Sequence, residues 1–220
     1  MIVTSRHLCA LIAALLLFCA LISSAVDLNR MQQLALSRYG QEAADTVGEW
    51  RSMIDDSKNL PEIKKLVAVN NFFNSRIRWV QDPEAWNQAD YWATPLQTMG
   101  KKMGDCEDFA IAKYASLILA GVDVSKLRIT YVKAAIGGIH AAHMVLAYYE
   151  TPTSEPTILD HLKLEIFPAS WRKDLTPVYG FNSLGIWVGG QISPSTTDTG
   201  ANLSRWSDLL QRAAAEGLGA

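Results

Sequence analysis

The spacing of apolar residues changes at Gly121, and this change is the feature that most constrains the fold. Upstream, apolar residues recur three and four positions apart, as in amphipathic helices. Downstream they alternate, as in half-buried strands. The expected helices begin at Asp27, Pro61 and Glu107, and the one from Pro61 should bury Ile63, Leu66, Val67, Phe73 and Ile77. The expected strands cover residues 127–134, 143–149, 157–167 and 179–188. Helices followed by antiparallel strands predict an α+β fold.

Residues 1–25 have the pattern of an export signal and are expected to lie outside the folded domain. Arg6 and His7 precede an apolar run over residues 8–22, and small residues then lead to Ala25. Because the run is short for a membrane span, we expect cleavage after Ala25, with an uncleaved inner-membrane anchor as the alternative. The mature protein is therefore expected in the periplasm.

The rest of the 220-residue chain is expected to form one domain over residues 26–192. A polar linker and an amphipathic helix should follow over residues 193–220. The formal net charge is −2 and no long basic run is present, so nucleic acid is not an expected partner.

Cys106 is the residue most indicative of chemistry. Cys9 and Cys19 lie in the predicted signal, so the mature chain keeps Cys106 alone, in an oxidising compartment. Such a thiol is either buried and inert or kept for its reactivity. Gly104 and Asp105 precede it as a loop end and a helix cap, which places Cys106 in the first turn of a helix. Free backbone N–H groups and the helix dipole favour a thiolate there and offer a site for an oxyanion.

A cysteine nucleophile needs a base and a group that orients the base. His140 follows a Gly-Gly pair in an expected loop, whereas His143 opens an expected strand. Asp160 lies on the next expected strand, within reach of His143. Helix cysteine, strand histidine and next-strand aspartate form a coherent triad, although on the residues alone each histidine is more often structural than catalytic.

Several separated segments resemble the bacterial transglutaminase-like cysteine proteinases. The matching segments are Gly-Asp-Cys-Glu-Asp at 104–108, Ala-Ile-Ala-Lys-Tyr at 110–114, Tyr-Trp-Ala-Thr-Pro at 91–95, Ala-His-Met-Val-Leu at 142–146 and Leu-Asp at 159–160. The resemblance extends over about residues 45 to 190. His161 departs from it, because an asparagine is expected after the aspartate.

The resemblance implies a papain-like, transglutaminase-like core with the nucleophile at a helix N-terminus packed on an antiparallel sheet. It implies that Cys106 is the nucleophile, His143 the base and Asp160 the orienting acid. It also implies a calcium ion beside the cysteine. The substrate it implies is a large surface adhesin, cut near its N-terminus at a small-residue site to promote biofilm dispersal. The partner it implies is an inner-membrane cyclic di-GMP receptor that sequesters the protease.

Three acidic residues flank Cys106 and should raise the pKa of its thiol. A bound Ca²⁺ would offset them, with Asp105 and Glu107 as ligands and Asp108 as a possible third. The alternative is that these acids only favour the positive end of the helix dipole.

Other functions use the same residues. A transglutaminase would pass the acyl group to an amine, and a cell-wall amidase would cut peptides of the wall. A binding module stabilised by calcium would carry an inert thiol. The leading hypothesis is a cysteine endopeptidase.

Overall fold

The computed structural model describes residues 26–188 and 201–219. The predicted signal and the predicted linker over 193–200 lie outside these residues. The helices are α2 (Leu28–Tyr39), α3 (Gln41–Ser57), α4 (Glu62–Arg76), α5 (Asp82–Ala85), α6 (Pro95–Lys101), α7 (Cys106–Leu119) and α8 (Ala201–Ala213). Short helical turns are η1 (Val124–Lys126), η2 (Ala169–Trp171) and η3 (Ala214–Leu218). Within the described ranges, no helix is both long and apolar enough to cross a membrane.

The strands form one antiparallel sheet and one short parallel pair. In the sheet the order is β6-β5-β4-β3-β7-β8. Its strands are β3 (Leu127–Ile136), β4 (Ile139–Tyr148), β5 (Thr157–Leu159), β6 (Phe167–Pro168), β7 (Leu175–Asn182) and β8 (Gly185–Val188). The parallel pair is β1 (Arg78–Trp79) with β2 (Met103–Gly104). This arrangement confirms the α+β expectation.

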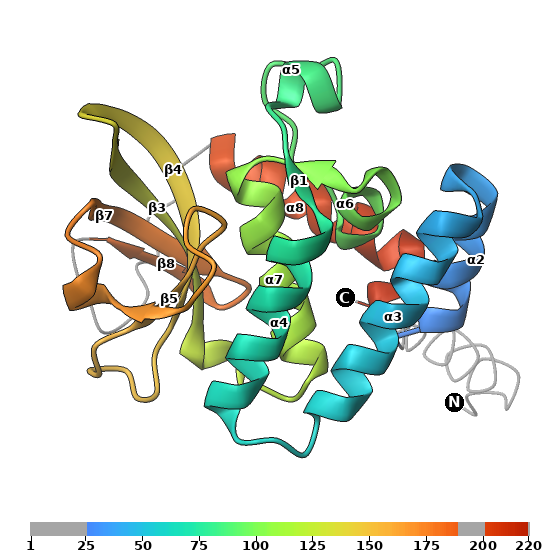
Figure 1. Ribbon diagram of the computed structural model, residues 1–220, viewed down its shortest axis with the longest axis horizontal. Coiled ribbons are helices and arrows are strands. Elements are labelled where there is room, and N and C mark those ends of the chain that lie inside the picture. The colour runs from blue at the N-terminus through green and yellow to red at the C-terminus, as the bar shows by residue number, and fades with distance from the viewer. Residues whose placement is uncertain (1–25, 189–200, 220) are drawn as a thin grey trace, which may run out of the picture.

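Helix α7 occupies the centre of the molecule (Figure 1). It packs against β3 and β4 on one side and against α3, α4 and α6 on the other. Ile111 and Leu117 belong to a core that also contains Trp50 of α3 and Ile129 of β3. The indole of Trp50 donates to the Ser116 hydroxyl at 2.7 Å, so α3 is tied to α7 by a buried hydrogen bond.

Several sequence-based boundaries were wrong. The segment 157–167 is two short strands separated by a loop, and 179–188 belongs to two strands, β7 and β8, joined by a tight turn. His140 lies in strand β4 rather than in a loop, and His143 lies inside that strand rather than at its start. On α4, Ile63 and Val67 are exposed, because the buried face includes the polar residues Lys65 and Asn70.

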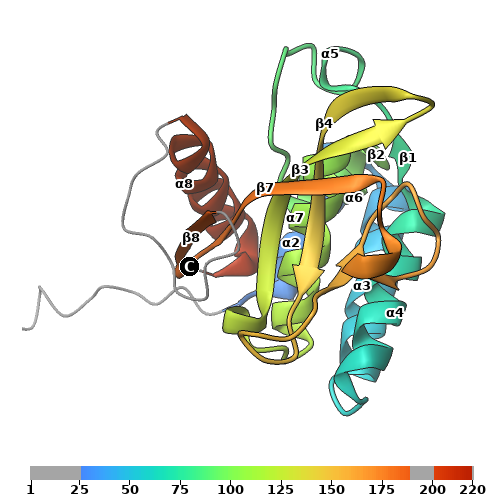
Figure 2. The same cartoon turned by 90° about the vertical axis from the view of Figure 1, so that its left-hand side faces the viewer.

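The two ends of the described chain meet. Trp206 and Leu209 of α8 belong to the central core. Figure 2 shows α8 and α4 on opposite sides of α7. After it, Gly217 accepts a hydrogen bond from the Asp27 backbone N–H at 2.7 Å. The φ angle of Gly217 is +105°, and a Cβ there would lie 2.4 Å from the Asp27 carbonyl oxygen, so only glycine fits this junction.

A buried carboxylate fixes the start of α7. Asp108 accepts hydrogen bonds from the backbone N–H of Ala93 at 2.7 Å, the indole of Trp86 at 3.3 Å and the backbone N–H of Asp105 at 3.4 Å. Gly104 leaves room for this side chain, since a Cβ at 104 would lie 2.6 Å from one Asp108 carboxylate oxygen.

Gly104→Ala should destabilise the protein, because the added methyl group must displace a side chain that is already held by three donors. We expect a loss of about 1–3 kcal/mol in the free energy of unfolding, the usual cost of overpacking. Gly48→Ala is the control, since its new methyl group meets only the flexible end of Gln32 and alanine is favoured inside a helix. Urea unfolding of both variants measures the difference, and equal stabilities would contradict this account.

Candidate active site

Cys106 is the first residue of α7, as the sequence predicted. Strand β2 pairs with β1, with Gly104 opposite Trp79, and delivers the chain to Asp105 in an extended conformation. Asp105 is the N-cap, and its side chain accepts from the backbone N–H of Asp108 in a capping box. The backbone N–H groups of Cys106 and Glu107 have no partner within the helix. The thiol therefore stands beside free donors at the positive end of the helix dipole.

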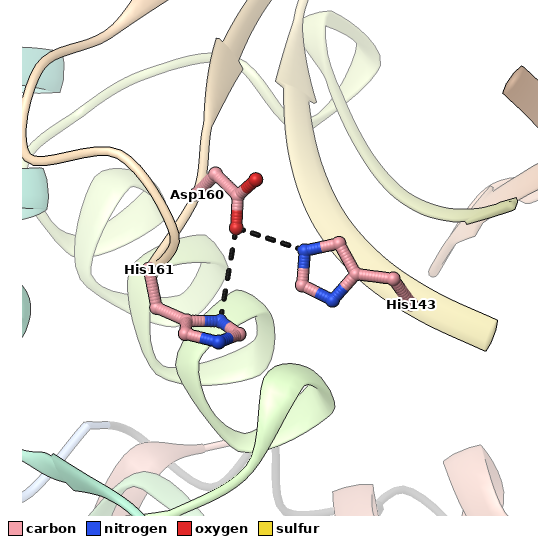
Figure 3. Close-up of side chains that lie close together, drawn as sticks. All are labelled: His143, Asp160 and His161. Atoms are coloured by element: carbon pink, nitrogen blue, oxygen red, sulfur yellow. Dashed lines mark hydrogen bonds and ion pairs between the residues drawn. The ribbon is translucent and has the colours of Figure 1, made fainter. Parts of the chain in front are cut away.

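His143 and Asp160 are in direct contact. The His143 Nε2 atom lies 2.9 Å from Asp160 Oδ1, and both side chains are almost completely buried. Figure 3 shows His143 projecting from β4 toward Asp160, which directly follows β5. Since Nε2 is engaged by the carboxylate, Nδ1 is the ring nitrogen that remains for proton exchange with a thiol.

Arg172 holds the other side of Asp160. Its Nη2 atom lies 2.6 Å from Asp160 Oδ2 and 2.8 Å from the carboxylate of Asp174. The backbone N–H of Leu162 donates to Oδ1 at 3.1 Å. Burial alone would raise the pKa of Asp160, but the bonds to His143, Arg172 and Leu162 hold it well below its usual range. Asp160 is therefore ionised at neutral pH.

Cys106 and His143 line the same pocket, of about 280 Å³. Asp90, Trp92, Glu107, Tyr131 and Tyr179 are also among its lining residues. The structure therefore brings the thiol of α7 and the histidine of β4 to one opening. The carboxylate that binds the histidine is buried and does not line the pocket.

The thiol is poorly ionised in this setting. Burial raises the pKa of Cys106, and the negative charges of Glu107 and Asp105 raise it further. The thiol points to Glu107, with 3.0 Å between Sγ and Oε2. The suppressed thiolate expected from the sequence is therefore found.

The acids near Cys106 belong to a larger cluster. Within the described residues, ligand atoms of Asp82, Asp105 and Asp108 lie within 4.8 Å of one another, as do those of Asp82, Asp90 and Glu107. Burial and the charge of Glu107 raise the pKa of Asp105, and burial raises that of Asp82 to about 6. A cluster of this kind is unfavourable unless protons or a cation neutralise it.

This cluster fits a hard cation such as Ca²⁺. One carboxylate oxygen of Asp82 and one of Asp105 are buried without any hydrogen bond. Such oxygens, with that of Glu107, are the ligands that Ca²⁺ takes. Asp108 fits less well than the sequence suggested, because both its oxygens already accept hydrogen bonds from the chain.

Sequence reasoning missed Asp82, Asp90 and Arg172. Asp82 precedes a proline, a pattern typical of a loop, and Arg172 lies in an irregular segment 12 residues after Asp160. No spacing rule connects residues so far apart in the sequence. Only the unusual density of acids between 82 and 108 was a usable signal.

Known proteins that are similar to this chain include cysteine proteinases. A family described as bacterial transglutaminase-like cysteine proteinase matches residues 33–173. A structure of Legionella pneumophila LapG is 38% identical, with a TM-score of 0.72, and the match covers 86% of this chain and 99% of LapG. No curated protein matches the sequence.

Two further LapG structures differ in calcium content. The calcium-bound form is 39% identical to this chain, with a TM-score of 0.74. The match covers 85% of this chain and 99% of the LapG chain. The EGTA-treated form is also 39% identical, with a TM-score of 0.75 and coverages of 86% and 99%. The expected transglutaminase-like fold is thereby confirmed.

Arg172→Met should destabilise the protein by about 3–5 kcal/mol at pH 7, the usual result of leaving a buried charge without its partner. The low pKa of Asp160 contributes stability above its unfolded value of about 4, and this is lost as the pH falls through the folded value. The difference in the free energy of unfolding between variant and parent should therefore become smaller in acid. Asp174→Asn, at a partly exposed site, should cost less than about 1 kcal/mol. Urea unfolding at several pH values tests all three expectations.

Calcium should raise the melting temperature more at pH 7.5 than at pH 5. Because the pKa values of Asp82 and Asp105 are raised, the metal-free fold has its full stability below the unfolded value of about 4 and loses stability as the pH rises above it. For Asp82 this loss is complete once the pH has passed its folded pKa of about 6. An ion replaces those protons. Thermal melts of metal-free protein with and without calcium measure the increment. Asp105→Asn should reduce it, whereas Glu84→Gln, an exposed acid, should not. A pH-independent increment would contradict this cause.

Proposed function

Because this chain belongs to the bacterial transglutaminase-like cysteine proteinases, we propose that it is a calcium-dependent periplasmic cysteine endopeptidase. Cys106 is the nucleophile, His143 the general base and Asp160 the group that orients His143. The observation that carries this assignment is the pocket shared by Cys106 and His143, with His143 Nε2 bound to Asp160. Arg172 in turn pairs with Asp160.

The reaction begins when His143 Nδ1 takes the proton of the Cys106 thiol. The thiolate attacks the carbonyl carbon of the substrate peptide bond and forms a carbon–sulfur bond, while backbone N–H groups at the start of α7 stabilise the negative oxygen. The His143 imidazolium then gives its proton to the leaving amine as the carbon–nitrogen bond breaks. His143 next takes a proton from water, whose oxygen attacks the thioester and releases a carboxylic acid and the thiol.

Asp160 contributes to the reaction by fixing the tautomer of His143 and by stabilising its positive charge. The ionised carboxylate holds the Nε2–H tautomer, so that Nδ1 has a free electron pair, and it stabilises the imidazolium that forms in each step. Arg172 keeps Asp160 ionised although it is buried.

Calcium would be held by Asp105 and Glu107, with Asp82 as a further ligand. When bound, the ion neutralises the carboxylates that raise the pKa of the thiol. The calcium-bound structure of Legionella pneumophila LapG supports this part of the proposal. The residues of this chain supply the same chemistry: buried carboxylate oxygens that nothing else in the described structure satisfies.

The proposed substrate is a large surface adhesin, cut near its N-terminus and released so that the biofilm disperses. The motif resemblance supports this proposal, and the predicted export signal agrees with it. Trp92, Tyr131 and Tyr179 line the pocket, and such bulky side chains favour small residues beside the cleaved bond. An inner-membrane receptor that senses cyclic di-GMP is the proposed partner that sequesters the protease.

Cys106→Ala should abolish cleavage of an adhesin N-terminal fragment by the purified mature protein. The parent should yield two shorter fragments in calcium and little product in EGTA, since the acids then suppress the thiolate. Cross-linked products would instead indicate a transglutaminase, and an intact adhesin with hydrolysed wall peptides would indicate an amidase. Cleavage by Cys106→Ala, or by alkylated parent protein, would refute a thiol mechanism. Glu84→Gln is the control for an acid remote from the thiol.

A further inference from the structure

A second histidine lies against the same carboxylate that binds His143. The Nδ1 atom of His161 is 3.7 Å from Asp160 Oδ1, the oxygen to which His143 Nε2 is bonded at 2.9 Å. Figure 3 shows both imidazole rings turned toward this one carboxylate, His143 from β4 and His161 from the chain that leaves β5. The catalytic role proposed for His143 and Asp160 makes no use of His161.

His161 is buried without a hydrogen bond on Nδ1. Its side chain is 9% exposed, and Nδ1 has no hydrogen-bond partner among the described residues. The ring is enclosed by Phe109 at 5.1 Å and by Trp79, stacked at 6.2 Å between ring centroids. A buried polar atom without a partner is costly, and it indicates a ligand that the chain itself does not supply.

The ring is in the form that binds metals. Burial lowers the pKa of His161 to about 4, in opposition to the charge of Asp160, so the imidazole is neutral at pH 7. Neutral imidazole nitrogen is the commonest protein ligand of transition metals. Carboxylate clusters take calcium, whereas two imidazoles with one carboxylate suit Zn²⁺.

We propose that His143, Asp160 and His161 form a Zn²⁺ site that switches the enzyme off. The three ligand atoms lie within 4.8 Å of one another. Tetrahedral Zn²⁺ with bonds of about 2.0–2.1 Å needs ligand atoms about 3.3 Å apart. The separations of 2.9 and 3.7 Å lie on either side of that value. Three protein ligands leave the fourth position to water, as in other open zinc sites.

The positive charge of Arg172 limits the affinity but does not remove the site. Arg172 contacts only Oδ2 of Asp160 and is also paired with Asp174, whose carboxylate offsets its charge. Oδ1 is the oxygen that faces both histidines. Trp79 is 49% exposed, so a movement of its side chain opens a path from solvent to His161.

Inhibition follows from the tautomer of His143. Zinc on Nε2 takes the place of the Nε2 proton, and the neutral ring then carries its proton on Nδ1. Nδ1 has no electron pair left for the Cys106 thiol, so the first proton transfer is blocked. This consequence rests on the proposed function, whereas metal binding itself does not.

The binding test uses Co²⁺ as a spectroscopic probe on the Cys106→Ala variant, with excess calcium to occupy the acidic cluster. We expect visible absorption that saturates at one Co²⁺ per chain and is lost on addition of Zn²⁺. Adding His161→Asn should weaken Co²⁺ binding at least about ten-fold, since the loss of even an outer-shell partner costs that much. His140→Asn, on an exposed histidine of the same strand, is the matched control and should bind as before.

Two results would overturn the proposal. One is equal Co²⁺ binding with and without His161. The other is binding by the parent but not by Cys106→Ala, which would place the metal on the thiol. A second experiment measures activity at constant calcium. The zinc concentration that halves cleavage is determined for the parent and for His140→Asn, and we expect the same value for both. If Co²⁺ binds as expected but the protein cleaves no adhesin, the proposed function fails and the metal site stands.

Discussion

The buried carboxylate of Asp108 is the interaction on which the site depends. It accepts hydrogen bonds from Trp86 and Ala93, near the two ends of the segment between α5 and α6, and from Asp105, the N-cap of α7. Because these donors come from both sides of α6, one side chain sets where α7 begins relative to the segment that carries the other acids. Gly104 makes this possible by leaving the space that Asp108 fills.

The local features of this protein were predictable and the long-range ones were not. Three predictions depend only on neighbouring residues, and each was confirmed. The helix stops before Gly121, strands follow it, and Cys106 lies at a helix start. The predicted buried face of α4 was wrong, because Lys65 and Asn70 are buried there. Each is held by a bond to another part of the chain, Lys65 to the Ala120 carbonyl and Asn70 to Lys113. Asp82 and Arg172 were missed for the same reason: their partners are distant in the sequence.

The site combines two opposite electrostatic environments, one that favours an ionised group and one that favours a protonated group. Around Asp160, positive and hydrogen-bonding partners keep a carboxylate ionised although it is buried. Around Cys106, burial and a dense group of acids keep the thiol protonated. The two halves meet at the pocket that Cys106 and His143 line, and under the proposed function the thiol gives up its proton only when the acids are neutralised. Such an arrangement makes the reactivity of the protein depend on its ionic surroundings.

The contact between Asp27 and Gly217 has a consequence for how the molecule is assembled. The last turn of the chain also supplies Glu216, which binds Arg38 and the Thr94 hydroxyl, so the C-terminal residues fasten α2 to α6. These bonds join residues separated by more than 100 positions. They can form only once residue 216 has been synthesised, so the link between α2 and α6 is completed late, after the segments that it joins have long been available to pack.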